Sequence, residues 1–340
     1  MAIPTIVRST DSGAPDLNGL EASCYNVLKF AMPLLGWTIA FDNATDKKIA
    51  FRNNAALGSG KYIQITDDDS IVGGDARKCK VKGYATMTAL DTGTGEWLPE
   101  DAFFTKSVGL NSTATPWIIV GDDISAIFFC GLVDFPNTHG YRPYPIGDID
   151  AFAPLDTAFM LAYGDSPAFS NNNKATLFET CIYGSDSVKR ANQFIPSGLS
   201  NNKGNTSVGI DALFISASPI LGSLSTSSVT FGTRGVYPER GTNKLLVSPL
   251  FVLDDEATDI DGYAYRGKLR GIFNPMHDLS FSGSQSGNHS FTNGQTIAGV
   301  SNGKGIADML LVMTSTSDGN GNSDRFEGSL LIDITSDWSA

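Results

Sequence analysis

A strongly apolar stretch, Trp117–Cys130, is divided into two runs by Gly121-Asp122-Asp123. The two runs, Trp117–Val120 and Ile124–Cys130, are rich in β-branched and aromatic residues, which favour strands. A Gly/Asp break between two such runs predicts a β-hairpin. Because almost every side chain in it is apolar, we expect both faces of this hairpin to be covered. The pattern therefore places the hairpin at the centre of a β-rich core.

The clearest helical pattern lies near the N-terminus. Apolar residues recur there at intervals of three and four, at Leu20, Cys24, Val27, Leu28, Ala31 and Leu35. Asn18 and Glu21 have the spacing of a capping box, and Pro33 and Gly36 end the pattern. The sequence thus predicts a helix over roughly Gly19–Met32, with an apolar stripe that packs on a sheet.

Alternating apolar and polar residues, typical of half-buried strands, follow this helix. They occupy Trp37–Phe41, Lys48–Arg52, Tyr62–Thr66 and Cys79–Met87. Asp91–Gly95 is rich in Gly and Thr and predicts a loop. With the hairpin, these segments predict one helix docked on an antiparallel sheet.

Proline is frequent in residues 134–165, which favours an extended connection or edge strands over central ones. The polar stretch Ser166–Lys174 predicts a domain boundary. Short apolar runs beyond it, joined by Ser, Gly and Asn, are typical of a sandwich or split barrel. They lie at Leu177–Tyr183, Ala212–Ser216, Ser228–Phe231, Leu245–Leu253, Tyr263–Ile272, Ala307–Met313 and Ser329–Ile334.

These patterns predict an α+β, mostly β fold. An N-terminal helix packs on an antiparallel sheet, and a β-sandwich or split-barrel-like half follows. The predicted parts are an extended N-terminal arm at 1–16, a helix-plus-antiparallel-sheet domain at 17–165 and a β-rich domain at 166–340.

Charge and composition narrow the classes of partner. The 340 residues carry a formal net charge of -12, which disfavours nucleic acid and anionic membranes as partners because both need a basic surface. No apolar run approaches the roughly 18 residues of a spanning helix, and residues 1–15 lack the pattern of a signal peptide. We therefore expect a protein made in a cytosol, with no membrane partner.

Candidate chemistry is sparse, and we expect neither a cofactor nor a metal. The four cysteines, without a CxxC pair, are better interpreted as buried free thiols than as zinc ligands or disulfides. His277 beside Asp278 could be an oriented base, but a turn histidine is the better interpretation. Gly283–Gly287 places Gln285 where a hydrolase nucleophile would stand. Gly58–Lys61 (GSGK) resembles a phosphate loop only in part, because the upstream glycine is missing and a strand follows.

Three acidic segments, Asp67–Asp69, Asp254–Asp261 and Asp318–Asp324, could supply carboxylates to calcium. Solvated turns are the simpler interpretation of each. Paired carboxylates for glycoside hydrolysis stay open in so acidic a chain, but no spacing singles out a pair.

A local group of cations stands out against the acidic background. Arg266, Lys268 and Arg270 fall on one face of an extended chain, and Gly267 and Gly271 allow close backbone approach. This group is our candidate subunit interface, where it would meet an acidic surface. The alternative is an internal partner such as Asp254–Glu256.

Several of these segments, taken in order, resemble an uncharacterised family of tailed-bacteriophage virion proteins. They are Ala14–Gly19, Tyr62–Asp68, Gly83–Met87, Asp91–Gly95, Lys106-Ser107, Trp117–Asp123, Ser248–Leu250 and Arg266–Gly271. The resemblance covers most of the chain and is tightest over residues 14–130. It implies a non-enzymatic structural protein of the neck, tail or baseplate, located in the virion and assembled in the host bacterial cytoplasm.

The expected partners are other virion proteins and further copies of this chain, with no small-molecule substrate. The N-terminal arm could become ordered on such a neighbour. Two alternatives stay open: a capsid decoration protein, and a carbohydrate- or receptor-binding module that uses exposed aromatics such as Trp97 or Tyr141.

Overall fold

The computed structural model describes residues 3–68, 77–94, 103–107, 111–131, 141–151, 160–162, 213–216, 247–254, 264–275, 294–316 and 325–338. Strands dominate these residues, and one α-helix, α1 (Ser23–Leu34), lies among them. Most strand pairs are antiparallel. The predicted α+β, mostly β class is therefore confirmed.

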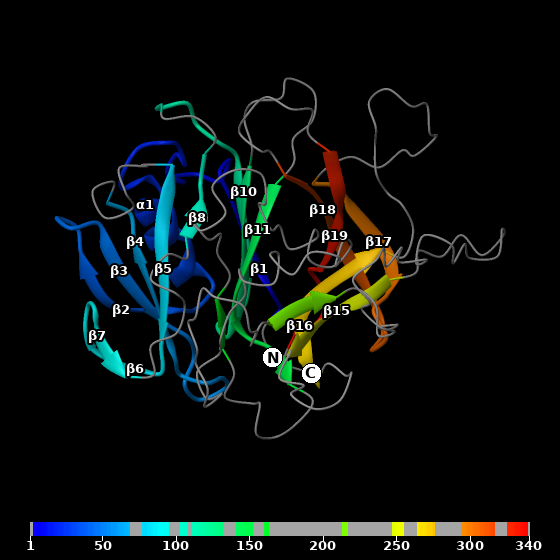
Figure 1. Cartoon of the computed structure of the whole chain (residues 1–340). Coiled ribbons are helices and arrows are strands. Elements are labelled where there is room, and N and C mark those ends of the chain that lie inside the picture. Colours follow the sequence, from blue (N-terminus) through cyan, green and yellow to red (C-terminus); the bar gives the residue numbers. More distant parts are fainter. Residues whose placement is uncertain are drawn as a thin grey trace, which may run out of the picture.

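The larger sheet has 12 strands and crosses the middle of the molecule (Figure 1). Its main path runs β1 (Thr5–Arg8), β9 (Trp117–Gly121), β10 (Ser125–Gly131), β11 (Tyr141–Asp148), β18 (Ile306–Thr316), β19 (Arg325–Asp333), β16 (Ala264–Pro275), β15 (Val247–Asp254) and β14 (Leu213–Ser216). Three short strands branch from it: β12 (Asp150–Ala151) on β16, β13 (Met160–Ala162) on β11 and β17 (Thr296–Ser301) on β18.

A second sheet of five strands lies on the other side of α1. It is ordered β2 (Thr38–Asn43), β3 (Lys48–Arg52), β4 (Tyr62–Thr66), β5 (Lys78–Tyr84) and β8 (Phe103–Thr105). A separate hairpin, β6 (Thr86–Ala89) and β7 (Thr92–Thr94), follows β5. The predicted loop over Asp91–Gly95 was thus partly wrong, since Thr92–Thr94 pairs as a strand and the turn lies at Asp91.

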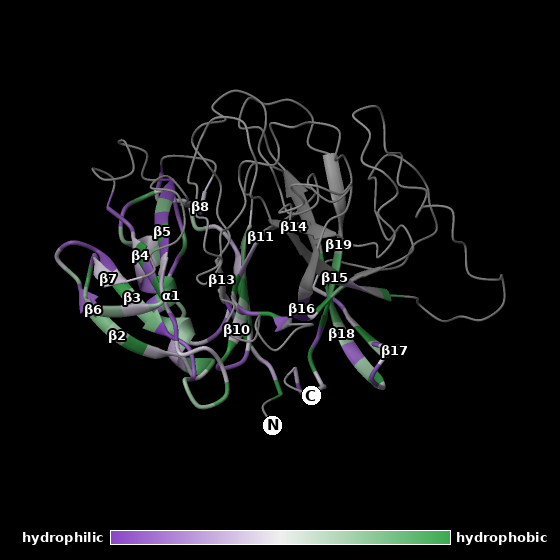
Figure 2. Cartoon of the chain, turned by 60° about the horizontal axis from the view of Figure 1, so that its bottom comes forward, coloured by the Kyte–Doolittle hydropathy of each residue, from purple (hydrophilic) through white to green (hydrophobic). Residues whose placement is uncertain are grey.

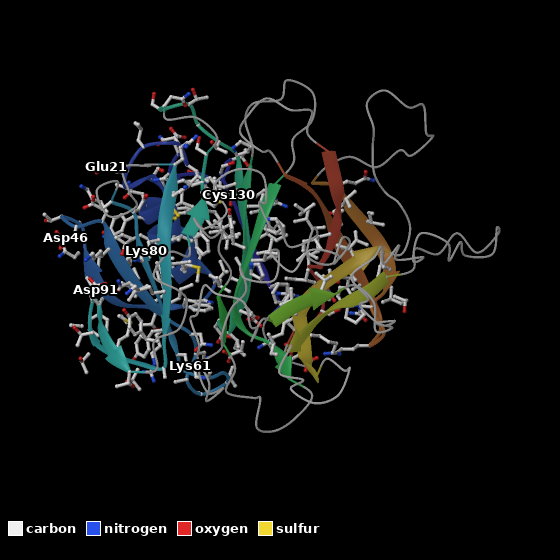
Figure 3. The ribbon with its side chains drawn as sticks, viewed as in Figure 1. Glu21, Asp46, Lys61, Lys80, Asp91 and Cys130 are labelled. Carbon is white, nitrogen blue, oxygen red and sulfur yellow. The ribbon has the colours of Figure 1, made fainter. Side chains whose placement is uncertain are left out.

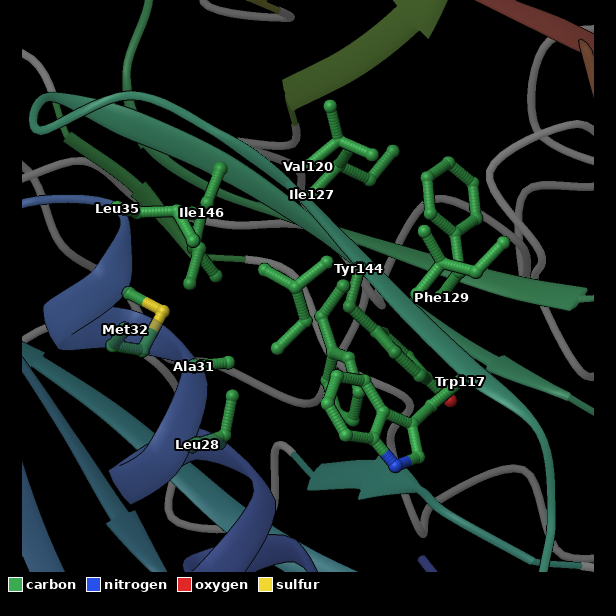
Figure 4. Packing of buried hydrophobic residues seen from close by; sticks show 14 of the residues in the cluster. Leu28, Ala31, Met32, Leu35, Trp117, Val120, Ile127, Phe129, Tyr144 and Ile146 are labelled. Carbon is green, nitrogen blue, oxygen red and sulfur yellow. The ribbon is translucent and has the colours of Figure 1, made fainter. Parts of the chain in front are cut away.

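The central hairpin is confirmed. β9 and β10 pair antiparallel with Cys130 opposite Trp117, and every residue in the two strands is buried. On one side it meets α1, whose Leu28, Ala31 and Met32 point toward the strands (Figure 4).

One hydrophobic cluster joins α1, the inner face of the five-stranded sheet and the central strands. Hydrophobic colour runs through the central strands β10 and β11, while β5 of the five-stranded sheet carries much hydrophilic colour (Figure 2). The β5 pattern follows from period-two alternation, in which Cys79 and Val81 face the core and Lys78, Lys80 and Lys82 do not.

Prolines do not exclude β11 from the interior of the sheet, so the expectation of edge strands in this region was wrong. β11 contains Pro143 and Pro145, pairs with β10 along its length, and has β13 and β18 on its other side. The latter two reach only residues 146–148 and Tyr141. The prolines therefore fall where the described strands leave the ladder open on that side.

Strands from both sides of the predicted domain boundary join the same 12-stranded sheet and the same hydrophobic cluster. The boundary segment itself, Ser166–Lys174, lies outside the described residues, and the division into domains stays a prediction. The same holds for the strands expected at Leu177–Tyr183 and Ser228–Phe231.

Part of the predicted N-terminal arm is extended, but it is ordered on its own chain. Residues Thr5–Arg8 form β1, which pairs with β9 from Thr5 opposite Gly121 to Arg8 opposite Ile118. Among the described residues, no helix has the length and apolar character needed to cross a membrane.

Candidate functional site

A buried polar junction lies where the β9–β10 turn meets three other parts of the chain. These are the Asn53–Lys61 loop after β3, the end of β11 and the middle of β16. The main side chains of this junction are all buried: Asn53, Asp122, Asp148 and Arg270. Charged and polar residues that are distant in the sequence meet at this site.

Asp122 builds both the turn and a cross-link. Its Oδ1 accepts hydrogen bonds from the amides of Ile124 (2.9 Å) and Ser125 (2.8 Å), which closes the hairpin turn. Its Oδ2 accepts from Arg270 Nη2 at 2.8 Å, with 7% and 2% of the Arg270 and Asp122 side chains exposed. The Trp37 indole N–H donates to the Asp122 carbonyl at 2.9 Å. One aspartate therefore connects the turn, β16 and Trp37, which lies between α1 and β2.

The GSGK segment binds an anion, and that anion is a carboxylate of the same chain. Asp148 Oδ2 accepts from the Ser59 amide at 2.6 Å, and Oδ1 accepts from Ser59 Oγ at 2.7 Å and Asn53 Nδ2 at 3.0 Å. A Cβ on Gly58 would lie 2.7 Å from Asp148 Oδ2, so this close approach requires glycine. The partial likeness to a phosphate loop thus has a structural explanation.

Burial sets the protonation of this part of the junction. It raises the pKa of the Asp148 carboxyl, while the hydrogen bonds from Ser59 and Asn53 and the charge of Arg270 lower it. Burial likewise lowers the pKa of Lys61, at the lower end of the five-stranded sheet in Figure 3, and the nearby Asp148 charge raises it. The arrangement holds these charges in place, with the Ser59 hydroxyl donating to the Asp148 carboxylate.

A second buried charged pair lies at the N-terminus of α1. Lys106 Nζ donates to Asp67 Oδ1 and, at 2.6 Å, to the Leu20 carbonyl. Asp67 Oδ2 accepts from the amides of Cys24 (2.8 Å) and Tyr25 (3.1 Å). An aspartate after β4 therefore satisfies the amides that a helix leaves open at its first turn.

This geometry corrects two predictions. The helix begins at Ser23 instead of about Gly19, and Ala22 at its N-cap makes no side-chain capping bond. The proposed capping box fails because Asn18 Oδ1 accepts from the Leu20 amide in a tight turn instead. Asp67, expected in a solvated acidic turn, is 1% exposed. The sequence prediction missed that the helix is capped by Asp67, a residue far away in the sequence.

The candidate interface of Arg266, Lys268 and Arg270 is corrected at Arg270 and stays a prediction for the other two residues. Arg270 is buried against Asp122, and Lys268 Nζ lies 3.2 Å from Asp150 Oδ2. Both cations pair with aspartates of the same chain, as the alternative interpretation expected. The partners are Asp122 and Asp150, however, and not Asp254–Glu256. Arg266 lies in β16, and its side chain is not among those described.

Other candidates cannot be placed. Four of them lie outside the described residues: His277, Gly283–Gly287, Trp97 and Asp318–Asp324. Most of Asp254–Asp261 and the side chain of Tyr141 are likewise not described. In the parts of the chain that the structure does describe, no three His, Cys, Asp or Glu side chains are grouped to hold a metal ion.

A comparison of the whole sequence with models of known protein families finds no match. A search among curated proteins finds no match either.

The raised pKa of the Asp67 carboxyl predicts that the stability of the fold depends measurably on pH. Burial raises the pKa of its carboxyl from 3.8 to about 6, against the opposing charge of Lys106. The folded chain therefore holds this proton more tightly than the unfolded chain, so the contribution of Asp67 to stability grows as pH falls from 6 to 4. Relative to Asp67→Asn, wild type should gain up to about 3 kcal/mol across this window. Denaturant unfolding of both proteins at pH 7, 6, 5 and 4 measures it, and a constant difference would contradict it.

Proposed function

We propose that this chain is a non-enzymatic structural subunit of a tailed-bacteriophage particle, located at the neck, tail or baseplate. It acts through interfaces with other virion proteins and with further copies of itself, and it is assembled in the cytoplasm of the host bacterium. A capsid decoration protein is the alternative position in the same particle.

The observation that carries this proposal is the ordered resemblance of these segments to the virion family. In the fold, several of the segments also bond to one another. The Trp117 indole donates to the Pro15 carbonyl at 2.9 Å, and the Thr115 amide just before Trp117 donates to the Leu17 carbonyl at 2.6 Å. These bonds join Ala14–Gly19 to the central hairpin. The two segments are about a hundred residues apart in the sequence.

Three further pairs of the segments that carry the resemblance are also bonded to each other. Asp67 in Tyr62–Asp68 binds Lys106, and Gln64 of the same segment donates to Asp91 Oδ1 at 2.7 Å and accepts from the Asp91 amide at 2.8 Å. Asp122 in the hairpin binds Arg270. These contacts show that the segments which carry the resemblance are joined to one another within the fold.

The chemistry of these contacts supports a structural role. These segments contribute four buried charged groups that are engaged with counter-ions, amides or carbonyls and that link the layers: Asp67, Lys106, Asp122 and Arg270. Buried and bonded in this way, they hold elements in register and are withdrawn from reaction with a substrate. This is the role expected of charged groups in a structural subunit.

The test is to purify the phage particles whose genome encodes this chain and to measure its copy number by quantitative mass spectrometry against the capsid and tail-tube proteins. We expect the chain in intact particles at a small, fixed copy number, and in the neck, tail or baseplate in an image reconstruction. A position only at capsid lattice points would establish the decoration role instead. Absence from washed particles would reject the proposal.

A further inference from the structure

Two buried thiols from different elements touch in the interior of the first half of the chain. Cys24 lies in the first turn of α1 and Cys79 lies in β5, and their Sγ atoms are 2.9 Å apart. Both side chains are 0% exposed. This separation is shorter than the roughly 3.5–4.0 Å at which non-bonded heavy atoms pack best. The two residues are 55 positions apart in the sequence.

Both backbones are held in place on either side of this contact. The Cys24 amide donates to Asp67 Oδ2 at 2.8 Å, and this carboxylate in turn binds the buried Lys106. Cys79 lies in a strand paired on both edges, with Phe104 of β8 opposite it and β4 on the other side. The approach of the two sulfurs is therefore imposed by the fold.

We propose that Cys24 and Cys79 form a redox modification site, which closes to an intramolecular disulfide when the chain meets a peroxide oxidant. The bond would link α1 covalently to the five-stranded sheet. Neither the contact nor the test depends on the proposed role in a phage particle, so the two can fail separately.

The chemistry balances with peroxide as the oxidant. One thiol sulfur attacks a peroxide oxygen, which breaks the O–O bond, gives a sulfenic acid and releases one water. The second thiol then attacks the sulfenic sulfur, forms the S–S bond and releases a second water. Two thiols are oxidised and one peroxide is reduced. The sulfurs need to approach by about 1 Å, since a disulfide bond is about 2.05 Å long.

Burial sets the rate of this closure. It raises the pKa of the Cys24 thiol well above its ordinary value, so thiolate is scarce at neutral pH. The pair therefore stays reduced in a reducing cytosol and closes slowly outside it, faster as the pH is raised. Cys130 on β10, labelled in Figure 3, is a third buried thiol. Its charge contributes to raising the pKa of Cys24, and it is the competing partner for a disulfide with Cys24.

The test uses the full-length chain, folded and reduced, incubated with hydrogen peroxide at pH 7 and pH 9. Samples are then unfolded, the remaining thiols are blocked with a maleimide, and tryptic peptides are mapped by mass spectrometry. We expect a Cys24–Cys79 cross-linked peptide, two hydrogens lighter than its parts, that accumulates faster at pH 9. Cys130 should remain a free thiol.

Two variants serve as controls. Cys130→Ser should form the same cross-link, whereas Cys79→Ser should leave Cys24 as a thiol. The oxidised wild type should also melt at a higher temperature than the reduced protein, because the bond restrains the unfolded chain. The proposal is overturned by a Cys24–Cys130 link, by survival of both thiols after long exposure at pH 9, or by a lower melting temperature after oxidation.

Discussion

Lys106→Met is expected to lower the free energy of unfolding by about 3–5 kcal/mol at pH 7, as is typical when one partner of a buried ion pair is removed. The Lys106 side chain is 0% exposed and that of Asp67 is 1% exposed. Methionine fills similar space, but it leaves the Asp67 carboxylate buried without a cation and removes the donor to the Leu20 carbonyl. Denaturant unfolding followed by tryptophan fluorescence measures the loss.

Lys29→Met is the matched control. Lys29 Nζ lies 2.6 Å from Asp42 Oδ2, but 41% of the lysine side chain and 31% of the aspartate are exposed. An exposed pair of this kind contributes at most about 1 kcal/mol. The same chemical change should therefore have a small effect on the surface of α1 and a large one at its N-terminus.

The double variant Asp67→Asn/Lys106→Met separates charge from packing. It removes both charges, and asparagine can still accept from the Cys24 amide, so it should be more stable at pH 7 than Lys106→Met alone. Lowering the pH to 5 should also reduce the loss in Lys106→Met, because the raised pKa of Asp67 lets its carboxyl take up a proton. Equal losses for Lys106→Met and Lys29→Met would contradict this account.

Sequence patterns predicted the elements whose structure depends mainly on their own side chains. The apolar runs on either side of Gly121 folded as the β9–β10 hairpin, because strands buried on both faces need no polar side chain in them. The alternating segments Lys48–Arg52 and Tyr62–Thr66 match β3 and β4 residue for residue. The alternation located these strands, but it did not predict that both faces would be covered, since Ala50 and Gln64 are buried as well.

Elements whose ends depend on distant residues were predicted less well. The start of α1 was misplaced because its first amides are capped by Asp67, which is 43 positions from Cys24. Pro143 and Pro145 suggested an edge strand, although β11 has neighbours on both sides. Short-range pattern contains no information on a cap or a gap in a ladder that tertiary contacts create.

The polar junction was not predictable for the same reason. Asp122 and Arg270 are 148 positions apart, and Asp148 and Ser59 are 89 apart. Asp122 was noticed as a turn aspartate, Arg270 as an interface arginine and Ser59 as part of a phosphate-loop likeness, but Asp148 was not singled out. What the sequence lacks is the pairing, since a local cluster of cations has the same pattern whether its partner lies inside the chain or on a neighbour.

Gly271→Ala is expected to destabilise the C-terminal part of the large sheet by at least about 3 kcal/mol, similar to the loss of a buried aromatic side chain. Gly271 lies in β16 with φ of 65°, and a Cβ there would overlap with the indole ring of Trp338. That ring is 4% exposed and its N–H donates to the Asp333 carbonyl at 2.9 Å. The methyl group would have to displace the tryptophan, which breaks this bond and opens the end of β19.

Gly303→Ala distinguishes this clash from backbone strain. Gly303 has φ of 85°, also in the left-handed region, but no atom lies within 4 Å of a Cβ built on it. It should lose only the conformational cost of about 1–2 kcal/mol that alanine has in this region. Thermal and denaturant unfolding of both variants provide the comparison, and Trp338→Ala combined with Gly271→Ala should show the two changes to be strongly non-additive. If Gly271→Ala costs no more than Gly303→Ala, then Trp338 does not pack on β16, and the C-terminal segment is anchored to the sheet by its Asp333 contacts alone.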